Sequence, residues 1–75
     1  MIKIGDFIVA IAECITHIRL DEKRPALVIG KEYKVIDVDY DKNKIAIDSE
    51  VVYYHIFDSE EIKENFGIDI LKPKQ

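Results

Sequence analysis

Acidic residues between positions 37 and 48 come closest to the spacing of a metal site. Acids alternate with other residues from Asp37 to Asp41, and Asp48 is the twelfth residue counted from Asp37. This spacing partly matches a calcium-binding loop, whose ligands alternate and whose twelfth residue is acidic. The sixth residue of such a loop is a glycine that makes a sharp turn, and here it is Lys42. We therefore interpret the run as the solvated face of a hairpin and expect no bound metal.

Cysteine and histidine form the second pattern with possible chemistry. Cys14 and His17 have ligand-like spacing, and His55 is the only other residue of either type. A structural zinc site takes four ligands, so these three residues fall short of one. Cys14 also lies in an apolar run, where burial raises the pKa of a thiol and makes it unreactive. No glycine-rich phosphate loop is present, and we expect no catalytic residues, no cofactor and no enzymatic activity.

Tyrosines and a basic segment favour binding to a partner over catalysis. A buried tyrosine hydroxyl needs a hydrogen-bond partner, so four tyrosines are difficult to bury together in a small domain. The polar segment 16–26 has no hydrophobic period, which predicts an exposed loop, and such loops often carry recognition. The predicted partner-binding residues are Tyr54, Tyr40, Arg19, Lys23 and Arg24. We expect them to form aromatic anchors with a charged rim on a protein-interaction module.

The charge of the chain is distributed unevenly. The formal net charge is −4, and the second half of the chain, from residue 37 onward, carries most of the acids. Nucleic-acid binding depends on Lys and Arg at phosphates, so this balance argues against it. Two alternatives to a protein-interaction module stay open. One is a nucleic-acid-associated barrel that uses Arg19, Lys23 and Arg24, and the other is an acidic inhibitor or nucleic-acid mimic that binds a host protein through residues 37–64.

Length and cysteine content set the broad class of the protein. The 75 residues make one domain, which we place at residues 1–71, followed by a solvated tail at 72–75. A single cysteine excludes an intramolecular disulfide and suits the reducing cytoplasm. The apolar run Phe7–Ala12 is too short for a signal core or a membrane span. We therefore expect a cytoplasmic protein without a membrane segment.

Alternating apolar residues predict four strands. The first covers residues 6–15 and is apolar on both faces, which predicts cover on both sides. In the second the phase slips at Val35–Ile36, which predicts a β-bulge, and residues 41–44 then supply a hairpin turn. The return strand begins at Ile45, and a fourth strand, again apolar on both faces, covers 51–57. This excess of apolar surface predicts homodimerisation through a strand face or edge.

The segment after these strands predicts one short helix. Asp58 followed by Glu61 fits an N-cap with a reciprocal acid three residues later. Ile62 and Phe66 are four residues apart and predict a buried stripe, and Gly67 is placed to end the helix. A short closing strand is expected over residues 68–71.

Short motifs give the chain a family resemblance. Ile4-Gly5-Asp6 and Leu27-x-x-Gly30-Lys31-x-Tyr33-x-Val35 resemble segments of small SH3-like barrel proteins common in bacteria and their phages, over about residues 4–66. The resemblance implies a mainly β fold, an SH3-like, partly open antiparallel barrel of about five strands with a helix near residues 58–66. Ser49-Glu50 stands where those proteins usually have a glycine. The family carries no agreed activity and no catalytic residues to transfer.

Overall fold

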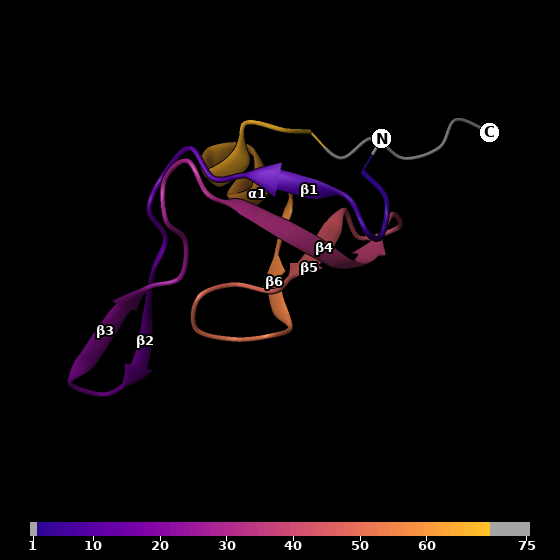
Figure 1. Cartoon of the computed structure of the whole chain (residues 1–75). Coiled ribbons are helices and arrows are strands. Elements are labelled where there is room, and N and C mark those ends of the chain that lie inside the picture. The colour runs from indigo at the N-terminus through magenta and orange to yellow at the C-terminus, as the bar shows by residue number, and fades with distance from the viewer. Residues whose placement is uncertain (1, 70–75) are drawn as a thin grey trace.

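Over residues 2–69 the fold is mainly β, with six strands in two antiparallel sheets and one short helix (Figure 1). This computed structural model describes residues 2–69, apart from the side chains of Ile18 and Arg19. In chain order the elements are β1 (Phe7–Val9), β2 (Ile15–Arg19), β3 (Glu22–Pro25), β4 (Glu32–Asp39), β5 (Lys44–Ile47), β6 (His55–Phe57) and α1 (Ser59–Phe66). The larger sheet has the order β1-β4-β5-β6, and β2 and β3 form a separate hairpin.

The core lies on one face of the four-stranded sheet, under α1. Alternate strand residues point to this inner face because side chains in a strand alternate with period two. The buried core side chains include Ile8, Tyr33, Val35, Ile45, Ile47 and Phe57 from the strands, and Ile62 and Phe66 from the helix. The rings of Phe57 and Phe66 meet edge to face at 5.8 Å between centroids. The opposite face of the sheet, which we call the outer face, carries no helix among residues 2–69.

The prediction for the first strand is wrong in two respects. It covers only Phe7–Val9, and the chain then runs through residues 10–14 before β2 begins. The expected cover on both sides is also absent among the described residues, because Phe7 and Val9 are 61% and 45% exposed on the outer face. Only the alternate residues Ile8 and Ala10 are buried. The apolar pattern therefore identified a strand, but half of its apolar residues stay exposed.

The predicted loop 16–26 is instead the hairpin β2–β3. Its register pairs Thr16 with Arg24 and His17 with Lys23. The strands were missed because a hairpin that buries no face needs no hydrophobic period. Backbone pairing satisfies its N–H and C=O groups, while its described side chains are exposed or half-buried. The hairpin projects from the rest of the protein (Figure 1).

Two features of the second and third predicted strands are confirmed. The register of β4 against β5 shifts between the pairs Val35–Ile47 and Asp37–Ala46, as the predicted bulge requires. Asn43 adopts a left-handed φ of 55° in the hairpin turn.

The predicted fourth strand is shorter than expected, because only His55–Phe57 pair with β5. Ser49 and Val52 exchange hydrogen bonds in a turn before it.

The helix is confirmed with both predicted ends. The side chain of Asp58 accepts from the backbone N–H of Glu61, and the Glu61 side chain accepts from the backbone N–H of Asp58. Gly67 ends the helix at φ 67°, and its N–H donates to the carbonyl of Lys63. Among the described residues, no helix is both long and apolar enough to cross a membrane.

A closed barrel is not confirmed. Within residues 2–69, β1 and β6 are the two edges of the larger sheet and do not pair with each other. Six strands are present where about five were expected, because the 16–26 segment contributes two. Ile68 and Asp69 form no strand, and the rest of the expected closing strand at 68–71 lies outside the described residues, as does the tail at 72–75.

Candidate functional site

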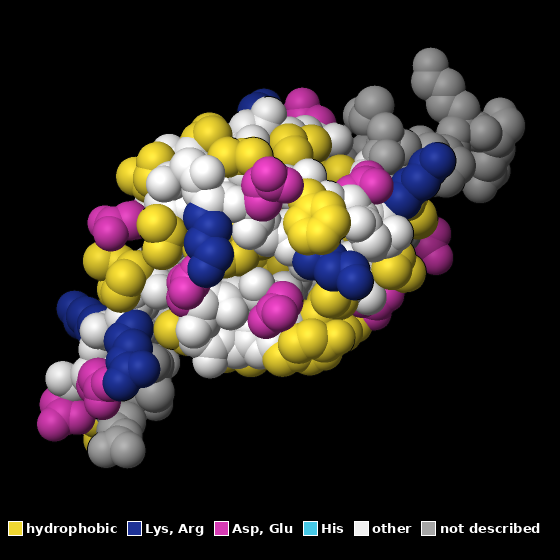
Figure 2. Space-filling view, viewed as in Figure 1, with side chains coloured by type: hydrophobic (Ala, Val, Ile, Leu, Met, Phe, Trp, Pro, Cys, Tyr) yellow, Lys and Arg dark blue, Asp and Glu magenta, His cyan; other side chains and the backbone are white. Residues whose placement is uncertain are grey.

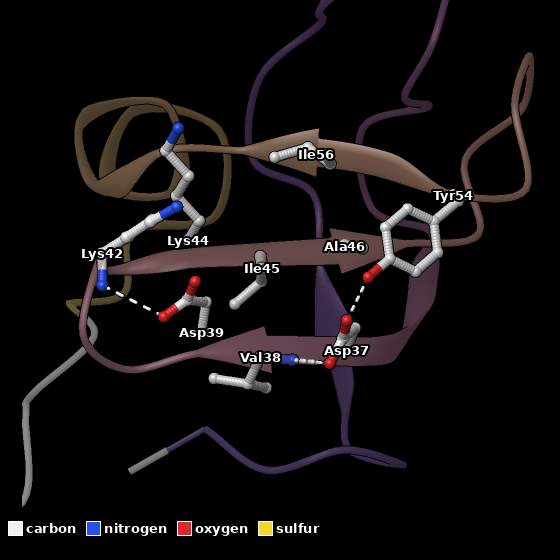
Figure 3. A pocket seen from close by; sticks show the side chains of 9 residues that line it. All are labelled: Asp37, Val38, Asp39, Lys42, Lys44, Ile45, Ala46, Tyr54 and Ile56. Atoms are coloured by element: carbon white, nitrogen blue, oxygen red, sulfur yellow. Dashed lines mark hydrogen bonds between the residues drawn. The ribbon is translucent and has the colours of Figure 1, made fainter.

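A shallow pocket of about 250 Å³ opens on the outer face where β4, β5 and β6 lie side by side (Figure 3). We call it the Ala46 pocket, after the residue at its centre. Its lining residues are Asp37, Val38, Asp39, Lys42, Lys44, Ile45, Ala46, Tyr54 and Ile56. The lining is therefore partly apolar, with a charged margin.

The pocket exists because a small side chain lies between two longer ones. The strand register places Ala46 opposite Asp37 of β4 on one side and Ile56 of β6 on the other. Ile45 and Ile47, its chain neighbours, are buried in the core, so Ala46 faces outward by alternation. It is nevertheless only 2% exposed, because the surrounding side chains rise above it. A methyl group between longer neighbours leaves a hollow with an apolar floor.

Tyr54 forms one wall of the Ala46 pocket and is held by Asp37. Its hydroxyl donates to Asp37 Oδ2, while Asp37 Oδ1 accepts from the backbone N–H of Val38 at 2.9 Å. The hydrogen bond to the carboxylate raises the pKa of the Tyr54 hydroxyl, because the neutral, donating form is favoured. The Tyr54 side chain stays 48% exposed. This predicted aromatic anchor is therefore a fixed wall beside open solvent.

Two lysines lie at the opposite end of the pocket from Tyr54 (Figure 3). Lys42 and Lys44 are exposed, and neither ammonium forms an ion pair within residues 2–69. The nearby acid, Asp39, accepts instead from the backbone N–H groups of Asp41 and Lys42 at 3.1 and 3.2 Å. Both carboxylates of the pocket are thus engaged inside the protein, whereas both ammonium groups are available. Sequence reasoning did not identify these lysines as site residues, because nothing in their spacing links them to Tyr54.

Tyr40, the second predicted aromatic anchor, lies elsewhere. Its hydroxyl donates to the backbone carbonyl of Ile2, and its half-buried ring packs against the core. The hydroxyl that was expected to meet a partner therefore holds the N-terminal segment onto the sheet. Tyr40 does not line the Ala46 pocket.

The basic candidates lie on the projecting hairpin. Lys23 and Arg24 are adjacent in β3, so they point to opposite faces of the hairpin. The Arg24 guanidinium pairs with Glu22 at 2.9 Å. The backbone of Arg19 pairs with Glu22 in the hairpin register. Figure 2 shows charged side chains of both signs over the projecting hairpin. No residue of the hairpin lines the Ala46 pocket, so the structure does not place these basic residues beside Tyr54.

A second cluster, which sequence reasoning missed, joins Lys31, Tyr33 and Glu50; we call it the Glu50 cluster. The Lys31 ammonium pairs with Glu50, and the Tyr33 hydroxyl donates to Glu50 at 2.8 Å and accepts from the backbone N–H of Val28 at 2.6 Å. The hydrogen bonds from Lys31 and Tyr33 lower the pKa of the Glu50 carboxyl, and the hydrogen bond to Glu50 raises the pKa of Lys31. The three groups satisfy one another. Lys31 and Glu50 are 19 residues apart, and no sequence spacing predicts their contact.

Ser49 and His55 form a pair that resembles part of a nucleophilic site. His55 Nδ1 lies 2.9 Å from Ser49 Oγ. Ser49 Oγ also donates to the carbonyl of Val52 and accepts from the N–H groups of Val51 and Val52. Burial lowers the pKa of His55, against a weaker opposing effect of Glu61. The hydrogen bonds of the Ser49 hydroxyl therefore stabilise the turn over residues 49–52, which is a structural role.

The structure also bears on the sequence patterns that suggested a metal site and a reactive thiol. Among the described residues, no three side chains of His, Cys, Asp or Glu come together as a group that could hold a metal ion. Burial is the main cause that raises the pKa of the Cys14 thiol.

Comparison of this chain with protein-family models, with curated proteins and with solved structures finds no match.

Proposed function

We propose that this chain is a small non-enzymatic protein-interaction module of SH3-like type, which binds a partner protein through the Ala46 pocket. The observation that carries the proposal is a half-exposed tyrosine, fixed beside an apolar floor, together with two ammonium groups that form no ion pair among residues 2–69. The SH3-like assignment is supported by the element order: a strand, a projecting hairpin, a bulged strand with a tight turn, two further strands and a short helix.

The chemistry of the pocket favours a particular kind of segment. The exposed side chain of Ile56 and the ring of Tyr54, on either side of the small Ala46, supply contact area for one apolar side chain of the partner. The carboxylates of Asp37 and Asp39 keep their charge but already accept hydrogen bonds from within the protein. Lys42 and Lys44 form no ion pair among residues 2–69, so their ammonium groups are the charged donors that a ligand can bind. Lys42 and Lys44 would pair with carboxylates that follow the apolar residue. The proposed ligand is therefore a short segment with one apolar residue followed by acids.

The same observations give less support to binding of nucleic acid. Phosphate binding needs several unpaired cations on one surface. Here Arg24 is paired with Glu22, and Lys23 points to the other face of the hairpin. Lys42 and Lys44 supply two cations to the Ala46 pocket, and two are few for a phosphate backbone, because its binding strengthens with each Lys or Arg contact.

Titration with synthetic peptides, followed by the backbone amide signals of the labelled protein, tests this function. One peptide carries a leucine followed by two glutamates, and the control carries a leucine followed by two lysines. We expect the acidic peptide to shift the amides of Ala46, Tyr54 and Ile56, and the basic peptide to leave them unchanged. The variant Lys44→Glu should lose binding, whereas Lys34→Glu, on the outer face but outside the pocket, should keep it. Equal shifts from both peptides, or shifts outside the pocket, would contradict the proposal.

A further inference from the structure

The tip of the β2–β3 hairpin has the chemistry that the Ala46 pocket would take. Leu20 is fully exposed at the tip, and the exposed Asp21 and the partly exposed Glu22 follow it in the chain. Within the described residues, the Asp21 carboxylate forms no ion pair, whereas Glu22 pairs with Arg24. An apolar side chain followed by acids is therefore presented at one extremity of the protein. An isolated two-stranded hairpin is marginally stable in water, so a docking partner would stabilise it.

We propose that two copies of this chain associate by docking the hairpin tip of one copy into the Ala46 pocket of the other. The inference rests on the proposed function, because it uses the same pocket. Leu20 of one copy would lie above Ala46, between the side chain of Ile56 and the ring of Tyr54. The carboxylate of Asp21 would meet the ammonium groups of Lys42 and Lys44, which have no internal partner among residues 2–69. The apolar residue of the tip thus faces the apolar part of the pocket, and the acid that follows it faces the two lysines.

The contact must join two molecules rather than close within one. None of the residues that line the pocket comes from the hairpin. The strands β2 and β3 pair with each other and belong to a separate sheet from β4, β5 and β6. Figure 1 shows the hairpin projecting away from the larger sheet. Because a tip and a pocket are different surfaces, a two-fold pair would contain two such contacts, whereas other head-to-tail arrangements would give larger rings or open chains.

The expected affinity is low. A hairpin tip in a shallow pocket buries far less than the about 1,200 Å² of a standard interface, so the association belongs to the weak class. Two contacts in a closed pair would strengthen it, because the second contact forms within the same complex. We expect a dissociation constant on the order of 100 µM, and therefore a monomer in dilute solution.

Sedimentation of the full chain over a range of concentrations tests the proposal. The average mass should rise toward that of a dimer between about 10 and 500 µM. The variants Leu20→Ser and Lys44→Glu should each weaken self-association by about tenfold or more, since each removes a central contact. Ile29→Ser removes another exposed apolar side chain, outside both surfaces, and should leave self-association unchanged. All three positions are exposed, and circular dichroism checks that each variant keeps its fold.

A charge exchange provides the sharper test. Asp21→Lys and Lys44→Glu should each weaken self-association by about tenfold or more when studied alone, because like charges then meet at the contact. Mixing the two variants should restore a dimer with one copy of each, since both of its contacts again join opposite charges. A wild-type chain that stays monomeric up to about 500 µM would overturn the proposal, as would failure of the mixture to associate. Neither result would remove the proposed function, which depends on the peptide titration instead.

Discussion

The Ala46 pocket and the Glu50 cluster contain similar groups in different states. Each combines one tyrosine with acidic and lysine side chains on or beside the same sheet; the Glu50 cluster has one acid and one lysine, and the Ala46 pocket has two of each. In the Glu50 cluster the tyrosine, the lysine and the acid all contact one another, and the tyrosine also accepts from a backbone N–H. In the Ala46 pocket the tyrosine and the acid contact each other, but the two lysines are left without a carboxylate among residues 2–69.

The difference separates a structural role from a binding role. Polar groups that satisfy one another gain nothing more from a ligand, and they hold together the segments that carry them. In the Glu50 cluster these segments are the turn before β4 and the loop after β5. Unpaired charges beside an exposed apolar surface can gain from a ligand. Changes in the Glu50 cluster should therefore alter stability without altering binding, and changes in the Ala46 pocket should do the reverse.

The largest effect on stability is expected from Tyr33→Phe. The substitution keeps the buried ring but removes the hydroxyl that accepts from Val28 N–H and donates to Glu50. Loss of these partners should lower the free energy of unfolding by about 1–3 kcal/mol. Urea unfolding measures the change, and the peptide titration should give the same affinity as for the wild type. Unchanged stability would show that water replaces the hydroxyl, and would remove the distinction between the two regions.

A smaller loss is expected from Tyr54→Ser, and it should appear in binding. This change removes the aromatic wall of the pocket while the core residues Ile45 and Ile47 stay in place. Peptide affinity should fall about tenfold, which corresponds to about 1.4 kcal/mol. Because the ring is half exposed, the free energy of unfolding should change by less than about 1 kcal/mol. A large loss of stability with unchanged peptide affinity would reverse the assignment of the two regions.

Acid should weaken the Glu50 cluster in a predictable direction. Its partners lower the pKa of the Glu50 carboxyl in the folded state, so the stabilisation is present above the unfolded-state pKa and is lost as the pH falls through the folded-state pKa. Stability should therefore decrease as the pH is lowered below about 4.5. Glu50→Gln should show less of this decrease, as measured by urea unfolding at several pH values. Identical pH profiles for wild type and variant would assign the acid sensitivity to other carboxyl groups.

Local sequence patterns predicted the parts of the fold that depend on local geometry. The capping pair of Asp58 and Glu61, the helix end at Gly67 and the left-handed turn at Asn43 each follow from the chemistry of one or two residues. The bulge in β4 was visible as a slip in the hydrophobic phase. The hairpin β2–β3 was missed because segment 16–26 has no hydrophobic period, and none of its described strand side chains is buried.

The candidate site was predictable only in part. The count of four tyrosines predicted that some tyrosine surface is exposed, and Tyr54 was selected because it lies on the strand face opposite Tyr53 and Phe57. Tyr40 was predicted as a binding residue too, but its hydroxyl meets Ile2 instead. The partners of Tyr54 in the pocket come from three strands, and their proximity depends on strand register. Asp37 and Tyr54 are 17 residues apart in the chain. Such contacts between distant positions cannot be inferred from local spacing.

The smallest effect is expected from Tyr54→Phe, which tests how the tyrosine acts. The substitution keeps the ring over the pocket and removes only the hydrogen bond to Asp37. If the ring supplies contact area, peptide affinity should change less than about threefold, against about tenfold for Tyr54→Ser. The bond lies near the surface, so the free energy of unfolding should change by less than about 1 kcal/mol.

The two Tyr54 variants must be compared in one peptide titration, because each serves as the control of the other. Equal losses from Tyr54→Phe and Tyr54→Ser would show that the hydroxyl and the position of Asp37 matter more than the ring. The free carboxylate of Asp37 would then repel the acids of the ligand, and Asp37→Asn in the Tyr54→Phe background should restore affinity. A loss confined to Tyr54→Ser would instead establish the ring as the anchor, with Asp37 serving to hold its orientation.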